Sequence, residues 1–471
     1  MKKNLEFLKV SGVIASLIIG CFPGVGQAAG MFLSPQGVRP LARGGAFIAG
    51  ADDLNALSYN PAGIAFARDG VMLGAGLPIH YTTFTRSDTD GDGMPQPSVV
   101  GEPLWLPSPT MGFTSDLGMW PGLRFAMGIA ADYPLLQNWP DALGDGSPAP
   151  QRYAIGDYQG TALSKLSMGI GYTESRWFSA GLALQVLTGR FVSTMTASNA
   201  AGSPVGTLPE NPEYDATIQV SSDPIFAPAL HVGVTLTPFK FLRIGAAWES
   251  GYSVSAMSDL AIRLPGAALF GDAIVTPSEP RAEVSMELPS VFRFGVEGRL
   301  GELLKSELAW VYEPWSVHQN IEIDASEVTV RGIKALGDYK LGVVDIERNY
   351  RDTWSVRWGT EFRPLLPTGA PLVLRTGVAY EPAAVDPQYL TPMVVDLDKI
   401  LLSAGIGYSL GRWTLEGTYA WVGMSDLSVD DSKATQTNAT RPSYEGRTVI
   451  GNGLYESSAH IVGMSVSLAL E

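Results

Sequence analysis

The sequence predicts an all-β fold, a transmembrane antiparallel β-barrel of about fourteen strands with an N-terminal plug inside it. Three observations lead to this prediction: segments in which apolar residues alternate with polar or small ones, connections that alternate between short and long, and a compact apolar stretch ahead of the first segment. A two-residue period is typical of β-strands, and strands that cross an outer membrane are apolar on one face only.

Length and composition narrow the class of protein. A chain of 471 residues can form one large barrel or two domains, and its formal net charge of −15 excludes a nucleic-acid partner, whose phosphates need a basic face. Charged residues make up only 17% of the chain, and no internal run approaches the roughly 18–20 continuous apolar residues of a membrane-spanning helix. Mild hydrophobicity spread along the whole chain suits a membrane barrel.

The N-terminus predicts export. Three lysines precede an apolar core at 10–22, and small residues follow as far as Ala29. We expect residues 1–28 to be a cleaved signal peptide and the mature chain to lie in the outer membrane of a Gram-negative bacterium. The stretch that ends at Cys21 also resembles a lipoprotein cleavage box, which would leave Cys21 lipidated. Cys21 is the only cysteine, so disulfides play no part in holding the fold.

Fourteen segments carry the strand pattern. At 412–422, for example, Trp421 lies on one face and Glu416 on the other. The candidate strands are 71–79, 109–115, 123–131, 163–173, 177–188, 229–237, 241–249, 291–300, 304–313, 354–363, 371–381, 401–410, 412–423 and 459–470.

The connections between these strands alternate in length. Outer-membrane barrels have short periplasmic turns and longer external loops, whereas a soluble β-sandwich, the other fold with such alternation, does not require this rhythm. Tryptophans also lie at turns or strand ends, as in an interfacial aromatic girdle, at Trp120, Trp177, Trp354 and Trp413. The short connections are 116–122, 174–176, 238–240, 301–303, 364–370 and 411, and the long ones are 80–108, 132–162, 189–228, 250–290, 314–353, 382–400 and 424–458.

Charged residues on the polar faces of the strands should point into the barrel. A charge that faces lipid near the membrane midplane costs about 2–4 kcal/mol, so we expect inward charges of both signs, paired across strands. They are Arg243, Glu249, Arg293, Glu297, Arg299, Lys305, Glu307, Arg357, Glu361, Arg363, Arg375 and Glu416.

Residues 29–69 precede the first strand and can fill the lumen of so wide a barrel. This segment is rich in Phe, Leu and Ile, and its Gly and Pro residues prevent a long regular element. Asp52 and Asp53 suit the first turn of a short helix that ends at Leu57, and Asn60-Pro61 then starts a turn. An apolar compact segment at the periplasmic mouth is typical of a plug, so the domains are predicted as 1–28, 29–69 and 70–471.

The stretch "ADDLNALSYNPAG" resembles the Asn-Pro-Ala plug motif of the FadL/TodX family of outer-membrane transporters. "AGMFLSPQG" resembles the start of that family's mature chains, and two later strand pairs, which begin at "ELPSVFRFGVEGRL" and "LRTGVAYEPAAVDPQYL", resemble its later strands. The resemblance implies a fourteen-stranded barrel closed by an N-terminal hatch, which moves long-chain fatty acids or aromatic hydrocarbons. The last strand departs from the usual pattern because it lacks a terminal aromatic residue.

The resemblance also implies roles for individual residues. Asn60, Pro61 and Ala62 would form the hatch motif, and Met31, Phe32 and Leu33 would be an N-terminal tip near the bound ligand. The third strand, "LRFAMGIAADYPLLQ", contains Gly128 and Pro134, and either residue type can interrupt strand pairing. This strand resembles the family's kinked third strand, so we expect a side opening into the membrane at Gly128, Asp132, Tyr133 and Pro134, next to the Asn60-Pro61 turn.

The sequence therefore predicts a passive transporter of hydrophobic compounds, and we favour long-chain fatty acids over aromatic hydrocarbons as its substrates. Capture would begin in the apolar external loops 264–275 and 133–143, which could alternatively pack together as a cap. A general porin is a further alternative. No enzyme activity is predicted, since the four histidines are scattered and no Gly-x-Ser-x-Gly elbow occurs. The predicted partners are hydrophobic small molecules, membrane lipid and lipopolysaccharide, and the chain is expected to be a monomer.

One acidic loop suggests a structural metal. Asp88, Asp90 and Asp92 alternate before Gly93, as in the first half of a calcium-binding loop. The twelfth position would be Val99, where an EF-hand has glutamate, so calcium and a bare acidic turn both stay open. No other cofactor is predicted.

Overall fold

The computed structural model places most of the chain in one elongated barrel. Among the predicted site residues, Met31, Asp132 and the three aspartates of the acidic loop lie outside the described residues, as does the predicted signal peptide. The structure describes residues 32–33, 36–87, 94–103, 105–118, 120–131, 133–134, 137–154, 156–175, 177–198, 210–334, 337–365, 371–435 and 449–470.

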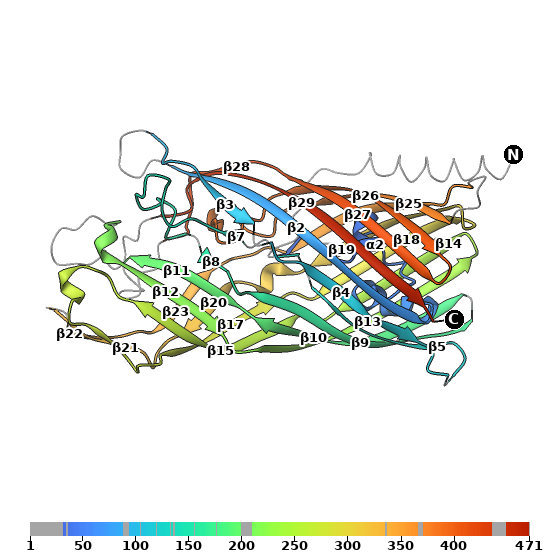
Figure 1. Cartoon of the computed structure of the whole chain (residues 1–471), viewed down its shortest axis with the longest axis horizontal. Helices are drawn as coiled ribbons and strands as arrows, with labels where there is room; N and C mark the ends of the chain where they lie inside the picture. Colours follow the sequence, from blue (N-terminus) through green and yellow to red (C-terminus); the bar gives the residue numbers. More distant parts are fainter. Residues whose placement is uncertain are drawn as a thin grey trace.

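The barrel wall consists of fourteen antiparallel strands among the described residues, so the predicted fold class is confirmed (Figure 1). Each strand pairs with the next one along the chain, and β29 pairs with β2 over seventeen residue pairs to close the barrel. The strands are β2 (Gly70–Arg86), β4 (Ser108–Ser115), β5 (Leu123–Ala130), β9 (Ala162–Ser175), β10 (Phe178–Arg190), β13 (Ile225–Phe239), β14 (Leu242–Glu249), β18 (Val291–Leu300), β19 (Leu304–Glu313), β24 (Thr353–Phe362), β25 (Leu372–Glu381), β26 (Lys399–Leu410), β27 (Trp413–Met424) and β29 (Gly453–Ala469).

Alternation along the strands separates a lipid-facing side from the interior. On β27, Tyr419 and Trp421 are exposed, whereas Thr418 and Ala420 between them are buried. Eleven of the twelve predicted inward charges lie on the strands, and most of these are buried. Arg363 is the exception, because β24 ends at Phe362 and the Arg363 side chain lies at the turn, 42% exposed.

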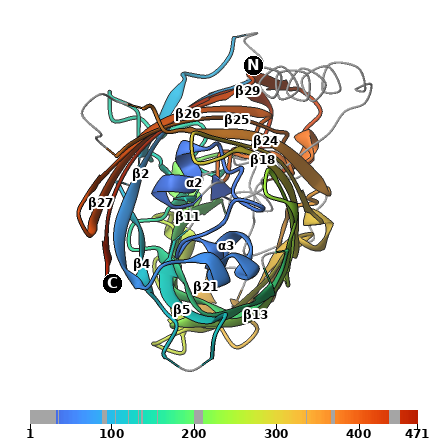
Figure 2. The same cartoon turned by 90° about the vertical axis from the view of Figure 1, so that its right-hand side faces the viewer.

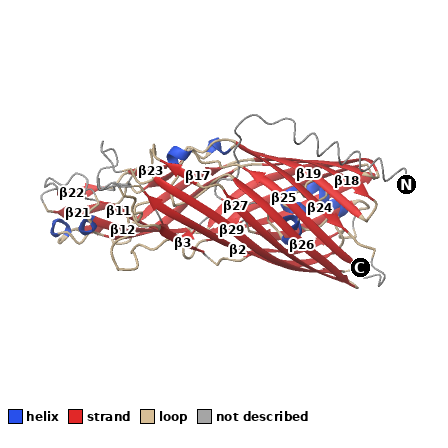
Figure 3. Ribbon diagram, turned by 90° about the horizontal axis from the view of Figure 1, so that it is seen from above, coloured by secondary structure: helices blue, strands red, loops and turns tan. Residues whose placement is uncertain are grey.

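Three of the predicted long loops are largely β-structure, which corrects the prediction that they are loops. They rise from the barrel as strands that form a seven-stranded antiparallel sheet at the end remote from the C-terminus (Figure 3). On its strand β15, buried and exposed residues alternate from Tyr252 to Asp259, so the barrel's strand pattern simply continues beyond the membrane. The sheet contains β8 (Gly156–Asp157), β11 (Val192–Ser198), β12 (Asp215–Ser222), β15 (Tyr252–Arg263), β17 (Arg281–Leu288), β20 (Asn320–Asp324) and β23 (Val343–Glu347).

The remaining external elements are short. Residues 264–275 contain a single 3-10 turn and the start of β16, and Phe270 of the turn packs against Val330 and Ile333, so this apolar stretch is part of a small core of its own. No helix in the described part of the chain is long and apolar enough to cross a membrane. These short elements are β3 (Val99–Pro103), β6 (Tyr133–Pro134), β7 (Gln137–Asn138), η2 (Pro212–Tyr214), η3 (Ala268–Phe270), β16 (Ile274–Thr276), η4 (Trp315–Val317), β21 (Thr329–Ile333), β22 (Gly337–Lys340), η5 (Pro387–Tyr389) and β28 (Leu427–Val429).

Residues 36–69, called the hatch below, fill the end of the barrel where the C-terminus lies (Figure 2). The hatch contains α2 (Val38–Ala42), α3 (Ala56–Tyr59) and η1 (Pro61–Phe66). The expected helix through Leu57 begins only at Ala56, because the Asp53 carboxylate accepts the backbone N–H of Asn55 and forms a turn there. Asp52 and Asp53 bind Arg39 instead of starting the helix.

The other half of the lumen holds the main apolar core. Wall residues such as Phe84, Leu187 and Ile225 meet inward-folded loop residues such as Trp139 and Leu390. Trp139 belongs to the apolar segment 133–143, so this segment contributes to the luminal core. The barrel therefore has a polar, hatch-filled half and an apolar half.

Candidate functional site

Asn60 fastens the hatch to the barrel wall. Its side-chain amide donates to the carbonyl oxygens of Ile48 and Val234, at 3.0 and 3.2 Å, and to Oγ1 of Thr235 at 3.1 Å. The Asn60 side-chain oxygen accepts the backbone N–H of Ala62 at 3.1 Å and so caps η1. One fully buried side chain thus links two parts of the hatch to β13.

Glycines in the wall receive the Asn-Pro-Ala motif. A Cβ built on Gly233 of β13 would overlap the Asn60 side-chain oxygen, and one on Gly181 of β10 would overlap the backbone of Pro61. Gly171 of β9 makes the same close approach to Ala65. We call this part of the barrel, formed by β5, β9, β10 and β13, the glycine wall. It holds the hatch by packing, and the hatch reaches it only because side chains are missing there.

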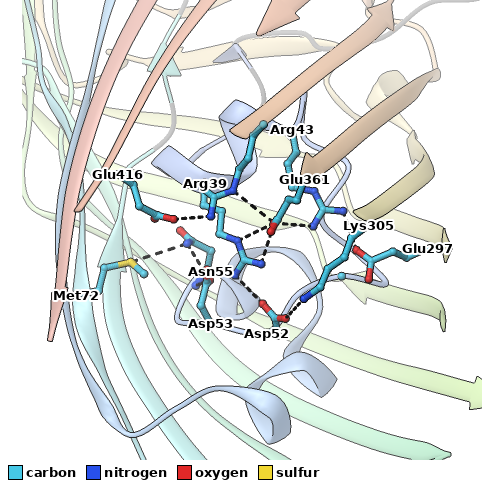
Figure 4. Close-up of polar contacts among 12 residues, drawn as sticks. Arg39, Arg43, Asp52, Asp53, Asn55, Met72, Glu297, Lys305, Glu361 and Glu416 are labelled. Atoms are coloured by element: carbon cyan, nitrogen blue, oxygen red, sulfur yellow. Dashed lines mark hydrogen bonds and ion pairs between the residues drawn. The ribbon is translucent and has the colours of Figure 1, made fainter. Parts of the chain in front are cut away.

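The opposite side of the barrel holds the hatch by charge (Figure 4). Arg43 is fully buried, and its guanidinium lies 2.8, 3.1 and 3.1 Å from carboxylate oxygens of Glu297, Glu307 and Glu361. Arg39 binds Glu361 at 2.8 Å and also binds both hatch aspartates. We call this side, formed by β18, β19, β24, β25 and β27, the charged wall.

Glu307 also binds the hatch backbone. One of its carboxylate oxygens accepts the N–H groups of Ile48 and Ala49 at 2.6 and 2.9 Å, and the other accepts that of Gly50 at 2.9 Å. Three successive backbone donors around one carboxylate form an anion-binding nest. Because the carboxylate belongs to the wall and the nest to the hatch, this contact fixes the position of the hatch in the barrel.

The wall is interrupted beside the glycine wall. Strand β2 pairs with β4 only from Gly70 to Gly76 and with β3 from Thr82 to Phe84, so residues 77–81 lack a described partner on that side. Strand β5 ends at Ala130, whereas its neighbour β9 extends three residues further, to Ala162. The short strands β4 and β5 thus leave a gap between two long ones.

Prolines account for the gap. Pro107 and Pro109 flank the first residue of β4, and proline has no N–H to donate to a ladder. Gly128 lies inside the regular β4–β5 pairing, opposite Gly112, and its nearest hatch side chains are those of Leu54 and Leu57. Asn60 and Pro61 themselves make their closest wall contacts with β13 and β10.

The N-terminal tip meets the same part of the wall. β1 (Phe32–Leu33) pairs with β6, with Phe32 opposite Pro134 and Leu33 opposite Tyr133. Two sets of predicted site residues, far apart in sequence, thus lie side by side. Pro134 belongs to this separate two-stranded ladder and does not continue the third barrel strand.

An apolar cavity of about 230 Å³ opens at the gap. Its lining comes from the ends of β4 and β5, from β9 at one edge of the gap and from the seven-stranded sheet, and includes Leu106, Ala131, Leu163, Leu187, Val254 and Leu288. Lys165 is the charged residue of the lining. Its ammonium lies 3.4 Å from Glu249, which also binds Arg293 at 2.8 Å and accepts the Tyr252 hydroxyl at 2.8 Å. The cation at the cavity is thus already paired.

Comparison with known proteins identifies the family. The family described as "Outer membrane protein transport protein (OMPP1/FadL/TodX)" matches residues 20–469. The chain belongs to this family. Its members are outer-membrane transport proteins, and this assigns the chain to the outer membrane and to transport rather than to catalysis. No curated protein sequence matches the chain.

Solved structures of the FadL/TodX family share the fold. A Pseudomonas aeruginosa FadL homologue has 16% identity and a TM-score of 0.71, with 94% of this chain and all of that chain covered. The P. putida toluene transporter TodX has 14% identity and a TM-score of 0.59, with coverage of 91% and 98%. The Ralstonia pickettii toluene transporter TbuX has 13% identity and a TM-score of 0.56, with coverage of 91% and 97%.

Two groups on the external side have shifted pKa values. Burial lowers the pKa of His318 to about 4, since its ring lies between Trp315 and Tyr350 and Arg348 is nearby. Burial raises the pKa of Asp396 to about 6, although Lys399 lies 2.5 Å away and opposes the shift. Both groups lie where the external segments fold back onto the apolar core.

For this FadL/TodX member, sequence reasoning found the hatch motif and the inward charges of the wall. It missed Arg39 and Arg43, the hatch residues that bind those charges, although two arginines in a buried apolar segment need carboxylate partners. It also missed Pro107 and Pro109, whose spacing marks an interrupted strand. Among the described residues, no group of three or more His, Cys, Asp or Glu side chains could hold a metal ion.

Proposed function

We propose that this protein takes up hydrophobic compounds through the apolar cavity and releases them sideways into the membrane through the gap beside β4. The observation that carries the proposal is the position of the cavity, which opens where β4 and β5 are shorter than their neighbours. Below it, the hatch is fixed to the charged wall by buried ion pairs. An apolar ligand gains about 0.8 kcal/mol for each CH₂ kept from water, so the bilayer is a better destination than the aqueous periplasm.

Two substrate classes fit this route. Long-chain fatty acids, which the sequence analysis favours, are longer than the cavity and would extend from it along the gap. Aromatic hydrocarbons are the second candidate, and two features of the cavity favour them. A cavity of about 150 Å³ lined by apolar residues accepts benzene, so about 230 Å³ suits a substituted ring. The cation at the cavity is also paired with Glu249, so a carboxylate would have to displace that partner.

A disulfide between the N-terminal tip and the segment that follows β5 tests the route. Leu33 and Tyr133 are opposite each other in the β1–β6 ladder, where Cα atoms lie about 4.5–5.5 Å apart, within disulfide range. The double variant L33C/Y133C should assemble normally and lose uptake of a hydrophobic compound when oxidised, because the bond fixes the tip to the segment beside the gap. Reduction should restore uptake.

The control for this experiment lies on the far side of the barrel. Ser306 and Thr360 face each other across β19 and β24, with hydroxyl oxygens 3.2 Å apart, so S306C/T360C adds a bond where no opening is proposed. Uptake should be unchanged in this oxidised variant. Undiminished uptake by oxidised L33C/Y133C would exclude the side route. Liposome swelling with sugars separates a general porin, which passes small polar solutes, from a hatched transporter.

We further propose calcium at the acidic loop, as the spacing of Asp88, Asp90 and Asp92 suggests. Chelation of calcium should then make the loop more sensitive to protease, and D90A should remove the difference between the two conditions. Mass mapping of the first cleavage products would locate the cut. A wild-type loop that is cut equally fast with and without chelator would be a bare acidic turn.

A further inference from the structure

A second cavity lies on the opposite side of the hatch from the apolar one. It has a volume of about 750 Å³, and its lining comes from the hatch and from the barrel end where the C-terminus is. The turns that border it are the short ones, which makes this the periplasmic end. We call this space the periplasmic vestibule.

The vestibule is positively charged in a protein that is strongly acidic. Its lining contains seven basic and five acidic residues, whereas the whole chain has a net charge of −15. Every one of the five acidic residues has a basic partner within 4 Å. Arg299 and Arg39 also bind Glu297 and Glu361, which do not line the vestibule, so the lining itself carries more basic than acidic groups.

Arg299 is the central cation of the vestibule. It binds Glu297 through Nε, but its Nη2 is buried and has no hydrogen-bond partner among the described residues. In the β18–β19 register it is directly opposite Lys305, and like charges in that position repel each other. Lys305 lies 3.9 Å from Asp52, which Arg39 also binds. Two facing cations with an unused donor form a place where an anion is stabilised.

A third cation, Arg243, lies near Arg299 and Lys305. The Arg243 guanidinium is buried and stacks on the Phe66 ring at 3.9 Å from its centroid, and no described carboxylate lies within 4 Å of it. Its positive charge adds to the field of Arg299. Phe66 lines the vestibule together with Leu54, Met72 and Phe113, so an apolar surface lies beside the cations.

We propose that the periplasmic vestibule binds an organic anion, a carboxylate attached to an apolar body. The carboxylate bonds to Arg299 and Lys305, and the apolar part packs on Phe66 and its neighbours. Because Lys305 also pairs with Asp52, a bound anion competes with the hatch for this cation and weakens the Lys305–Asp52 contact. The vestibule thereby couples anion binding at the periplasmic end to the hatch. This site is separate from the apolar cavity, so it does not rest on the proposed uptake route.

Binding of hexanoate to the purified barrel in a neutral maltoside detergent tests the proposal, with hexanol as the uncharged probe of the same length. Ligand-detected NMR should show hexanoate binding that weakens with added salt. The dissociation constant should rise at least tenfold in R299Q and in K305Q. It should be unchanged in R281Q, which removes an equal charge from the exposed external sheet, and in L288W, which fills the apolar cavity.

The outcomes that overturn the proposal are distinct. Equal hexanoate binding by wild type and by R299Q/K305Q excludes the site, and so does hexanol binding with the affinity of hexanoate. Displacement of hexanoate by an equal concentration of inorganic phosphate excludes recognition of the apolar part. If the variants fail to assemble, labelling of the wild-type protein with a photoreactive hexanoate analogue tests the proposal instead. Labelling near Phe66 supports the vestibule, and labelling confined to the apolar cavity overturns it.

Discussion

The charged wall and the glycine wall hold the same hatch by different physical means. On the charged wall, Arg43 and Glu307 are fully buried and meet partners at 2.6–3.1 Å. On the glycine wall, contact comes from close backbone approach at Gly181 and Gly233, with Asn60 as the main polar link. The first kind of contact adds buried, directional ion pairs to close glycine contacts such as that of Gly377, while the second depends on shape and a few neutral hydrogen bonds.

This difference fits the proposed side opening of the barrel. The gap beside β4 adjoins the glycine wall, where the ion pair between Asp69 of the hatch and Arg124 of β5 is partly exposed and the neighbouring cavity is apolar. On the charged wall, removal of one partner would leave buried charges without compensation. A transporter that must open sideways while its hatch stays in place therefore needs one rigid wall and one that yields. The predictions below test this division.

Removal of Arg43 should have the largest effect on the stability of the barrel and on its conductance. R43M removes one cationic partner from each of Glu297, Glu307 and Glu361, and removing one partner of a buried ion pair costs about 3–5 kcal/mol. The hatch should detach from the charged wall, and the barrel should leak small ions. Urea unfolding in lipid and single-channel conductance measure the two effects. R43K keeps a charge but loses the fork of donors, so it should lie between wild type and R43M. A tight and fully stable R43M barrel would contradict the rigid wall.

A methyl group added to the glycine wall should have an intermediate effect on the stability of the barrel. G233A places a Cβ against the Asn60 side-chain oxygen and should cost about 1–3 kcal/mol through overpacking. G417A is the matched control, since its Cβ would meet only Ile406 at 3.8 Å, so its stability should stay within about 0.5 kcal/mol of wild type. G233A should keep the hatch in the barrel, because Arg43 still holds it. The same conductance assay checks this, and a leak as large as that of R43M would mean that the two walls are equivalent.

The barrel was predictable from the sequence because its signal is repeated. Fourteen strands each show the alternation, so an error in the bounds of one strand does not change the predicted fold class. The external sheet was missed for the same physical reason. Strand β15 alternates as clearly as the barrel strands, but nothing in a two-residue period says whether the apolar face meets lipid or a neighbouring loop. The sequence pattern predicted the short turns, but it did not predict how far the strands extend beyond the membrane.

The site was only partly predictable because its contacts are distant in sequence. Arg43 and Glu307 are 264 residues apart, and neither has a local signature of its partner. Asn60 was found because proline follows it and the motif resembles that of a known family. The gap was attributed to Gly128 and Pro134, whereas the strand that fails is the neighbouring β4, with Pro107 and Pro109. A break in strand pairing depends on both neighbouring strands, so the Gly and Pro residues of one strand alone do not locate it.

The smallest expected effect is a change in the stability of the external fold with pH. The contacts between the hatch and the two walls should not change. The pKa of His318 is lowered to about 4 by burial, against about 6.5 in an unfolded chain. Above pH 6.5 the ring is neutral in both states, so His318 does not affect stability. As pH falls from 6.5 to 4, the unfolded or opened state binds the proton more readily, and the external fold beside Trp315 should loosen. Asp396, with its pKa raised to about 6, works in the opposite direction, because acidification relieves its buried charge.

The comparison of H318Q with wild type isolates the histidine from that opposing group. Limited proteolysis of the external sheet between pH 7 and 4.5 should become faster on acidification in wild type and less so in H318Q. The glutamine amide can still donate towards the Glu287 carbonyl, which the His318 ring meets at 2.9 Å, but it does not titrate. Conductance should stay low throughout, because the hatch contacts lie at the other end of the barrel. Identical pH profiles for the two proteins would show that His318 is a packing residue, and acid-induced leakage would place the weak point at the hatch.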